Sequence, residues 1–484
     1  MVKNKKNKRK VNKKAVRLVK KQNKKKIRKT TKKSHKAKVV IKKKAKNHNT
    51  KVKTLRKNIK VDDKKIDSLL QQVINEIKPS NDYYQAIKIR TDEVISKISK
   101  AIKSKDIDAS IFVGGSLAKG TLLKKDVNDV DLFIRFEDEK IEKFAEIMKE
   151  TKEDYRMIHG SRDYAQIRKD NIIFEIIPVM KINNPKEANN VTDLTYFHVD
   201  YVLEKISKNP ELINQIVLTK TFAHASGAYG AESYIKGFSG YAIELLMIHY
   251  GSLKNFAVAV ANSNEKQKII IDTQKHYKGK RVIHEVNGSK LKSPIVLIDP
   301  TFKERNALAA LSEETYKKFK EYCIEFLKNP SEESFKEKII DRKKLFDQAM
   351  NNGRDFAIIE ITTNKQEGDV AGTKLLKFSK MFASEMKRYY ENPEITFYYD
   401  EKQRGIMFFT GKKIKEAIIK GPPINMPEAV KAFMKKYQAT INDGKNLCAA
   451  VSLNLDFSEA LKRFIVMHTK TMKEMGITSI KEIN

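Results

Sequence analysis

Cysteine is scarce in this chain of 484 residues, and its scarcity excludes several classes of protein. The two cysteines, Cys323 and Cys448, are far apart and belong to no CxxC or Cys/His cluster. Neither a disulfide framework nor a zinc site is therefore expected. The cysteine content instead predicts a reducing, cytoplasmic location. Long apolar runs are also missing. No stretch of 18 apolar residues predicts a transmembrane helix, and the basic N-terminus lacks the apolar core of a secretory signal.

Acidic residues are absent from the first 60 positions, which contain 29 Lys or Arg. The rest of the chain carries the other 69 basic residues and all 60 acidic ones, so most of the net charge of +38 belongs to residues 1–60. Mutual repulsion and a shortage of apolar side chains predict that this segment is disordered in isolation. The functional interpretation is an RNA-binding arm that releases counterions from phosphates, and the alternative is a solvated tail.

Globular composition begins near Asp62, and the overall hydrophobic fraction of 40% is enough for a core. Apolar residues at helical spacing predict helices over residues 66–77 and 84–102. Apolar runs predict strands over 110–113, 130–136 and 171–179, and residues 118–122 are expected to open a helix. Residues 202–261 are predicted to be largely helical, with glycine breaks between 227 and 241. The length suggests two to four domains.

The C-terminal half alternates between strand-like and helical segments, which predicts an α+β domain. Strands are expected over 294–299, 355–362, 395–399 and 405–409, and helices over 311–327 and 375–390. The basic residues Lys278, Lys280 and Arg281 are candidates for contacts to a nucleic-acid backbone, although a solvated loop is the simpler interpretation.

The segment GGSLAKGTLLKKDVNDVDLFIRF, residues 114–136, carries the most informative chemistry. Gly115 and Ser116 close a strand with a tight turn that lets backbone N–H groups approach a phosphate. Lys119 follows closely and can place a cation on the same phosphate. Asp129 and Asp131 lie two residues apart at the start of a strand, so both carboxylates share one face. A divalent cation such as Mg²⁺ offsets their repulsion.

Glu175 is a candidate third carboxylate, because it is the single acid within the apolar strand IIFEII, residues 172–177. A charge in such a place needs a partner or a metal ion. The alternative is a salt bridge to Arg168 or Lys169. The GS turn, the basic residue, the paired acids and the later strand acid together are typical of polymerase-β-like nucleotidyltransferases. These enzymes transfer a nucleotide from a nucleoside triphosphate and release pyrophosphate.

Several further segments resemble one family within this group, the archaeal (class I) CCA-adding tRNA nucleotidyltransferases. The resemblance runs from about residue 65 to at least 437. It depends on the segments TDLTYFH (192–198), VLTKTF (217–222), GAYGAE (227–232), KGFSGYAIELL (236–246), IDPTFKERN (298–306) and GPP (421–423).

The resemblance implies a role for individual residues of this chain. Asp129, Asp131 and Glu175 would be the catalytic, metal-binding carboxylates, with Mg²⁺ as the cofactor. A strict residue count would choose Asn128 as the first acid, but only Asp129 shares a face with Asp131. The implied nucleotide-binding residues are Ser116, Lys119, His198, Lys220 and Tyr229.

Two of these positions depart from the family pattern. The family usually has Arg at the position of Lys119, and Lys keeps the charge but loses the planar fork that binds phosphate through two hydrogen bonds. The family more often has Asp at the position of Glu175, so the catalytic geometry shifts by one methylene. Without the resemblance, His198 would be interpreted as a core or capping histidine and Tyr229 as an aromatic residue of a turn.

The implied fold is α+β and multidomain. It comprises a disordered basic N-terminal arm (1–60), a polymerase-β-like nucleotidyltransferase head (61–200), a helical central domain (201–330) and an α+β C-terminal body and tail that bind tRNA (331–484). The implied function is template-independent addition of CMP, CMP and AMP to the 3′ end of tRNA from CTP and ATP. Family members often form dimers, which leaves a homodimer open, and no membrane partner is expected.

Other functions remain as alternatives at this point. Another template-independent RNA nucleotidyltransferase, such as a poly(A) polymerase or an oligoadenylate synthetase, shares the head motifs but not the central segments. A non-catalytic RNA-binding protein of the same fold would not need the three intact acids. A dinucleotide-binding enzyme is not expected, because no GxGxxG motif opens a βαβ unit.

Overall fold

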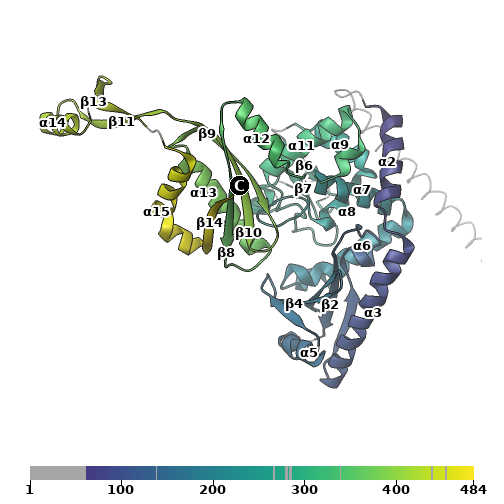
Figure 1. The fold of residues 1–484 in the computed structure, drawn as a ribbon. Coiled ribbons are helices and arrows are strands. Elements are labelled where there is room, and N and C mark those ends of the chain that lie inside the picture. Colours follow the sequence, from purple (N-terminus) through teal and green to yellow (C-terminus); the bar gives the residue numbers. More distant parts are fainter. Residues whose placement is uncertain are drawn as a thin grey trace, which may run out of the picture. The chain divides into compact units, whose positions relative to one another are not determined.

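The computed structural model describes residues 61–484, except 138, 265–266, 278–281, 283–285, 338, 438–439, 453–454 and 484. The basic arm and the candidate contacts Lys278, Lys280 and Arg281 therefore lie outside the described residues. The chain divides into two compact units (Figure 1). The first unit runs to Ser226 and also contains Gly240–Ala309 and Tyr316–Lys336. The second contains Gly227–Ser239, Ala310–Thr315 and Glu337–Asn484.

The first described elements are the two predicted helices, α2 (Asp63–Ile77) and α3 (Asn81–Ser104). Each begins after a polar cap whose side chain accepts a hydrogen bond from the first turn, from Lys65 N–H in α2 and from Tyr83 N–H in α3. The cap satisfies a donor that would otherwise have no partner within the helix. The apolar stripe of α3 then packs against a sheet.

This sheet has five strands in the order β1-β2-β5-β4-β3. Strands β2 and β5 are parallel, and the other neighbouring pairs are antiparallel. Helices α3 and α5 contribute to one core with alternate residues of β2, which include Val130 and Leu132. The opposite face of β2 carries Asp129 and Asp131. The bounds are β1 (Ala109–Val113), β2 (Asn128–Phe136), α5 (Phe144–Glu150), β3 (Tyr155–Ile158), β4 (Tyr164–Lys169) and β5 (Ile172–Met180).

The predicted helix over 118–122 is wrong. A single helical turn, α4 (Gly115–Ala118), begins directly after β1 and ends before that segment. Gly120 has a φ of +66°, which stops a right-handed helix, and Thr121 N–H donates to Ser116 O. The turn therefore folds back on itself and leaves Thr121 buried.

The predicted helical region over 202–261 is confirmed. It forms α6 (Thr195–Lys208), α7 (Leu212–Ala225), α8 (Gly240–Tyr250) and α9 (Leu253–Ala261). Phe222 of α7 is fully buried and contacts Phe319 and Phe326 of α11 (Glu313–Lys328). The predicted strand over 294–299 contains β7 (Ile295–Leu297), which pairs in parallel with β6 (Ile269–Ile271).

The second unit contains the predicted C-terminal α+β fold. A four-stranded antiparallel sheet has the order β14-β8-β10-β9. Phe382 and Phe464 belong to a core on one face with β8 and β10, while Leu345 packs with Phe408 in a smaller core. The bounds are α12 (Arg342–Asn351), β8 (Asp355–Thr363), α13 (Asp369–Met386), β9 (Tyr390–Tyr399), β10 (Arg404–Lys413), α15 (Phe457–Met475) and β14 (Ile477–Ile483).

Two details differ from the sequence predictions for this unit. The helix expected over 375–390 begins earlier and ends at Met386, because Tyr390 already belongs to a strand that pairs with β10. A further small sheet, β11-β13-β12, contacts a helix and was not predicted in detail. Its elements are β11 (Glu416–Pro423), α14 (Pro427–Lys436), β12 (Thr440–Asn442) and β13 (Asn446–Ser452).

Two expectations drawn from scarcity can be compared with the structure. Cys323 and Cys448 are both buried and neither forms a disulfide. Within the described part of the chain, no helix is long and apolar enough to span a membrane. The predicted boundary between residues 200 and 201 stays a prediction, because head and central residues share the first compact unit.

Candidate active site

Three carboxylates come together on two parallel strands of the first unit. Asp129 and Asp131 are two residues apart on β2, so they project from the same face. Asp131 lies directly opposite Glu175 of β5 in the strand register. The neighbours Val130 and Leu132 are fully buried on the other face. The fold thus places the three acids that the sequence singled out at adjacent positions.

The protonation of these acids reflects their crowding. Burial raises the pKa of Asp131 and of Asp129, although Asp129 as a whole residue is exposed. Burial, followed by the charges of Asp131 and Asp129, raises the pKa of Glu175 to about 7. The charges of Lys119 on Asp131 and of Lys125 on Asp129 act in the opposite direction. Full ionisation of the three acids therefore calls for additional positive charge.

Glu175 has polar neighbours on the adjacent strand β4. Its carboxylate accepts hydrogen bonds from Gln166 Nε2, at 3.4 Å, and from the Tyr164 hydroxyl. The salt bridge to Lys169 that the sequence left open is wrong. Lys169 Nζ instead lies 2.8 Å from Glu153 Oε1. Lys169 is therefore not the partner of the Glu175 carboxylate.

Asn128, the residue that a strict count would place in the acidic pair, has a different environment. Its side chain is buried, and its amide donates to the hydroxyl of Tyr83 on α3 and to Lys125 O. Asn128 therefore faces the side of the sheet that α3 covers. Asp129, not Asn128, shares the opposite face of β2 with Asp131.

The glycine turn lies against the acidic pair. Gly114 N–H donates to Asp131 O at 2.9 Å. Gly115 has a φ of +56°, and a Cβ atom at this position would collide with Asp131 Oδ2. Only glycine fits both the backbone conformation and the close approach. The turn consequently brings Ser116, the next residue, beside the carboxylates.

The two lysines of the predicted site meet at an acid that the sequence did not single out. Lys119 Nζ lies 2.6 Å from Glu244 Oε2, and Lys220 Nζ lies 3.4 Å from Glu244 Oε1. Lys220 also donates to Thr121 Oγ1 at 3.1 Å. Burial, followed by the charge of Lys119, lowers the pKa of Lys220 to about 8 against the opposing effect of Glu244. Glu244 is a lone acid in the apolar helix α8, and this was the signal available in the sequence.

His198 belongs to a second buried polar cluster in the same unit. Its Nε2 atom lies 3.1 Å from Asp299 Oδ2, and its ring stacks on Tyr241 at 4.1 Å. Asp299 also accepts from the Tyr241 hydroxyl and from Arg305 Nη1. Burial lowers the pKa of His198, whereas Asp299 raises it. Burial raises the pKa of Asp299, but His198 and Arg305 outweigh this and hold it well below its usual range.

Tyr229 belongs to the other compact unit. It is half-buried and forms a β-bridge with Phe238 in the glycine-rich segment 227–239. Ser233 of the same segment donates from its N–H to Asp369 Oδ1, at 2.7 Å, at the start of α13. The structure therefore gathers Asp129, Asp131 and Glu175 on adjacent strands and brings Lys119 and Lys220 to Glu244. Tyr229 is assigned to the other compact unit.

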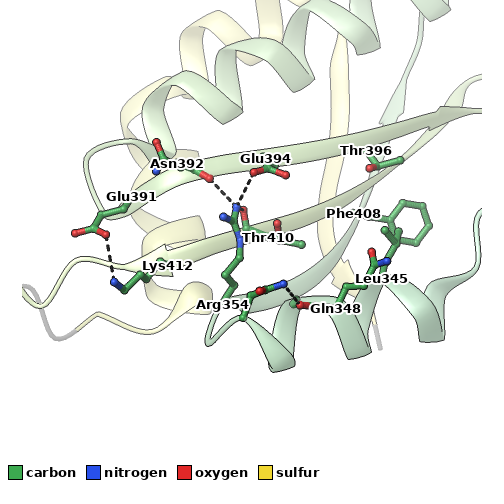
Figure 2. Close-up of a pocket in the computed structure, with 12 residues that line it drawn as sticks. Leu345, Gln348, Arg354, Glu391, Asn392, Glu394, Thr396, Phe408, Thr410 and Lys412 are labelled. Carbon is green, nitrogen blue, oxygen red and sulfur yellow. Dashed lines mark hydrogen bonds and ion pairs between the residues drawn. The ribbon is translucent and has the colours of Figure 1, made fainter. Parts of the chain in front are cut away.

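The second unit contains a cavity of about 360 Å³ between α12 and the strands β9 and β10 (Figure 2). Arg354 lies at its centre, donates to Asn392 O and Thr410 O, and pairs with Glu394. The positive charge of Arg354 is thus matched by Glu394 within the cavity. It contains none of the predicted site residues, so the carboxylates of the first unit remain the better candidate for chemistry.

The carboxylates of the first unit suit a divalent metal ion as donors. They are hard oxygen ligands with raised pKa values, which binding of a cation would relieve. Among residues the structure describes, no three His, Cys, Asp or Glu side chains are arranged closely enough to hold a metal ion by themselves. In this structure Asp129, Asp131 and Glu175 therefore do not form a complete three-ligand group.

Comparison with known proteins identifies two domain types along the chain. A family model described as a nucleotidyltransferase domain matches residues 95–219. A model described as the second domain of tRNA nucleotidyltransferase matches residues 214–336. The first match contains the three carboxylates, and the second contains Lys220 and Glu244.

Curated relatives extend the similarity further along the chain. The chain is 38% identical to the CCA-adding enzyme of Nanoarchaeum equitans over 50% of its own length and 59% of that relative. It is 28% identical to the CCA-adding enzyme of Methanocaldococcus jannaschii over 77% of its length and 84% of the relative. The corresponding enzyme of Thermoplasma volcanium is 28% identical over 75% and 80% of the two chains.

Proposed function

We propose that this protein adds CMP, CMP and AMP in turn to the 3′ end of tRNA without a nucleic-acid template. The chain belongs to the family of archaeal CCA-adding enzymes. The observation that carries the proposal is the register that sets Asp131 beside Glu175, next to the Gly115 turn. The nucleotidyltransferase family to which the head belongs generally uses divalent metal ions.

The reaction we propose is an in-line substitution at the α-phosphate of CTP or ATP. The 3′-hydroxyl oxygen of the tRNA forms a bond to the α-phosphorus, and the bond from this phosphorus to the bridging oxygen of pyrophosphate breaks. The hydroxyl proton passes to water or to a carboxylate. Asp129, Asp131 and Glu175 would hold the metal, which we assign as Mg²⁺. When bound, the ion would lower the pKa of the attacking hydroxyl and neutralise charge on the leaving group.

The remaining site residues bind and orient the triphosphate in this proposal. Ser116 supplies a hydroxyl and backbone N–H groups at the turn, while Lys119 and Lys220 supply positive charge. His198 is held by Asp299, which fixes the orientation of its ring. Tyr229 would contact the base or the sugar, a role supported only by the family resemblance.

Three finer assignments follow from the same membership. We assign tRNA, CTP and ATP as substrates, the cytoplasm as the location and a homodimer as the oligomeric state. The two buried free thiols are compatible with a reducing compartment. Light scattering of the purified protein tests the dimer, for which a monomeric mass is the contrary result.

Radiolabelled tRNA that ends at the discriminator base provides the test of the proposed site. The wild-type protein should extend it by three nucleotides in the presence of CTP, ATP and Mg²⁺. Asp129→Ala and Asp131→Ala should each abolish extension while tRNA binding changes little, because the carboxylates serve the chemical step. Retained extension in both variants would remove these residues from the catalytic site.

A further inference from the structure

A buried acid links the two lysines of the proposed triphosphate site. Glu244 lies in α8, where the surrounding sequence GYAIELLMIHY contains no other acid. Its side chain is 1% exposed, and those of Lys119 and Lys220 are 7% and 4% exposed. The two lysines come from α7 and from the end of the glycine turn, which are 101 positions apart in sequence.

Each oxygen of this carboxylate has its own lysine. Glu244 Oε2 lies 2.6 Å from Lys119 Nζ, and Oε1 lies 3.4 Å from Lys220 Nζ. A buried charge of either sign is costly without a partner, so the three groups depend on one another. The Thr121 carbonyl and hydroxyl oxygens hold Lys220 from a second direction, at 3.3 and 3.1 Å.

We propose that Glu244 is a positioning residue, which presets Lys119 and Lys220 for the triphosphate before the nucleotide binds. A lysine side chain has a flexible four-carbon stem, and ordering it during binding costs affinity. The contact with Glu244 occupies only one of the three N–H donors of Lys119, so the ammonium group can bind phosphate while it stays anchored. The inference rests on the proposed function, because that function makes the two lysines triphosphate ligands.

The two ammonium groups depend on Glu244 because it is the acid that each of them contacts within 3.4 Å in this buried cluster. Loss of Glu244 would leave two buried ammonium groups in mutual repulsion, and at least one would turn away or lose its proton. The expected defect is therefore in nucleotide binding.

The experiment compares Glu244→Gln with a matched control, Glu153→Gln. Glu153 also pairs with two lysines, Lys97 and Lys169, but Lys97 belongs to α3 on the opposite, helix-covered face of the sheet. In the tRNA extension assay, Glu244→Gln should raise KM for CTP and for ATP about tenfold, with kcat changed by less than about threefold. Glu153→Gln should leave both constants unchanged, and neither variant should change the Kd for tRNA.

A double-mutant cycle separates positioning from general damage. If Glu244 acts through Lys119, then Glu244→Gln should raise KM much less in a Lys119→Met background than in the wild type. Equal effects in both backgrounds would overturn the proposal. If Glu244→Gln lowers Tm strongly, Glu244→Asp is tested in its place. This variant keeps the negative charge but moves the carboxylate away from the lysines by one methylene. It should then raise KM with an unchanged Tm, and an unchanged KM would overturn the proposal.

The wild-type reaction distinguishes the two levels of failure. If the wild type does not extend tRNA, the proposed function fails. If it extends tRNA and Glu244→Gln has wild-type KM values, only the role of Glu244 fails.

Discussion

Replacement of Glu175 by Gln should stabilise the folded protein above pH 7 while it abolishes nucleotide addition. The pKa of Glu175 is raised from 4.5 to about 7 by burial and by the charges of Asp131 and Asp129. Between these two values the folded protein retains a proton that the unfolded chain has lost, so stability falls as the pH rises. Above about pH 7 the penalty is complete, and below 4.5 it vanishes. Gln carries no charge and escapes the penalty.

The size of the effect follows from the two pKa values. At 1.36 kcal/mol for each pKa unit, the gap between 4.5 and about 7 corresponds to roughly 3 kcal/mol. Partial exposure of Glu175 and changed hydrogen bonds with Gln166 reduce this, so about 1.5 kcal/mol is expected at pH 8. For a domain of this size, that gain corresponds to a rise in Tm of about 3–6 °C. At pH 5 roughly a quarter of the gain should remain.

Differential scanning fluorimetry in metal-free buffer at pH 5 and pH 8 measures this change. Glu153→Gln is a control of opposite sign. Burial raises the pKa of Glu153, but the contacts with Lys169 and Lys97 outweigh burial and lower this pKa. The ionised form of Glu153 therefore stabilises the folded protein, and Glu153→Gln should lower Tm at pH 8. Added Mg²⁺ should raise the Tm of the wild type more than that of Glu175→Gln. A Glu175→Gln protein that is less stable than the wild type at pH 8 would contradict a raised pKa for Glu175.

Three further changes test other parts of the site. Gly115→Ala should lower kcat/KM at least about 100-fold in the extension assay, because its Cβ atom would collide with Asp131 and its backbone has positive φ; near wild-type activity would contradict this packing. The pKa of Lys220 lies at about 8, so kcat/KM of the wild type should fall as the pH rises through this value. Lys220→Met should raise KM for CTP and ATP about tenfold and should remove this fall. An unchanged pH profile of kcat/KM in the variant would exclude Lys220 as the cause of the fall. Deletion of residues 1–60 should weaken tRNA binding in a filter assay and flatten its salt dependence while CCA addition persists, and lost nucleotide selectivity would contradict the division between arm and catalytic body.

Local sequence patterns predicted much of the fold, because the periodicity of apolar residues indicates many of the helices and strands. The apolar stripe of α3 and the alternation of β2 were readable without tertiary information. Strands β3 and β4 were missed because their short, mixed sequences YRMI and YAQIRK carry no clear alternation. They become strands through pairing, β4 with β5 and β3 with β4. The helix expected over 118–122 was misplaced because the positive φ of Gly120 depends on how the turn folds back on itself.

The candidate site was predicted unevenly for a related reason. Period 2 put Asp129 and Asp131 on one face, and the lone acid of an apolar strand indicated Glu175. The parallel register that joins the two strands is a tertiary feature. Glu244 was missed because its partner Lys119 is 125 positions away, and no local pattern encodes that contact.

Sequencing the 3′ ends of the product shows directly whether the protein adds CCA. A tRNA that ends at the discriminator base is incubated with the wild-type protein, Mg²⁺ and all four nucleoside triphosphates. Nearly all extended molecules are expected to end in C, C and A and to grow no further. Homopolymeric tails, 2′–5′ linkages or unextended tRNA would contradict CCA addition.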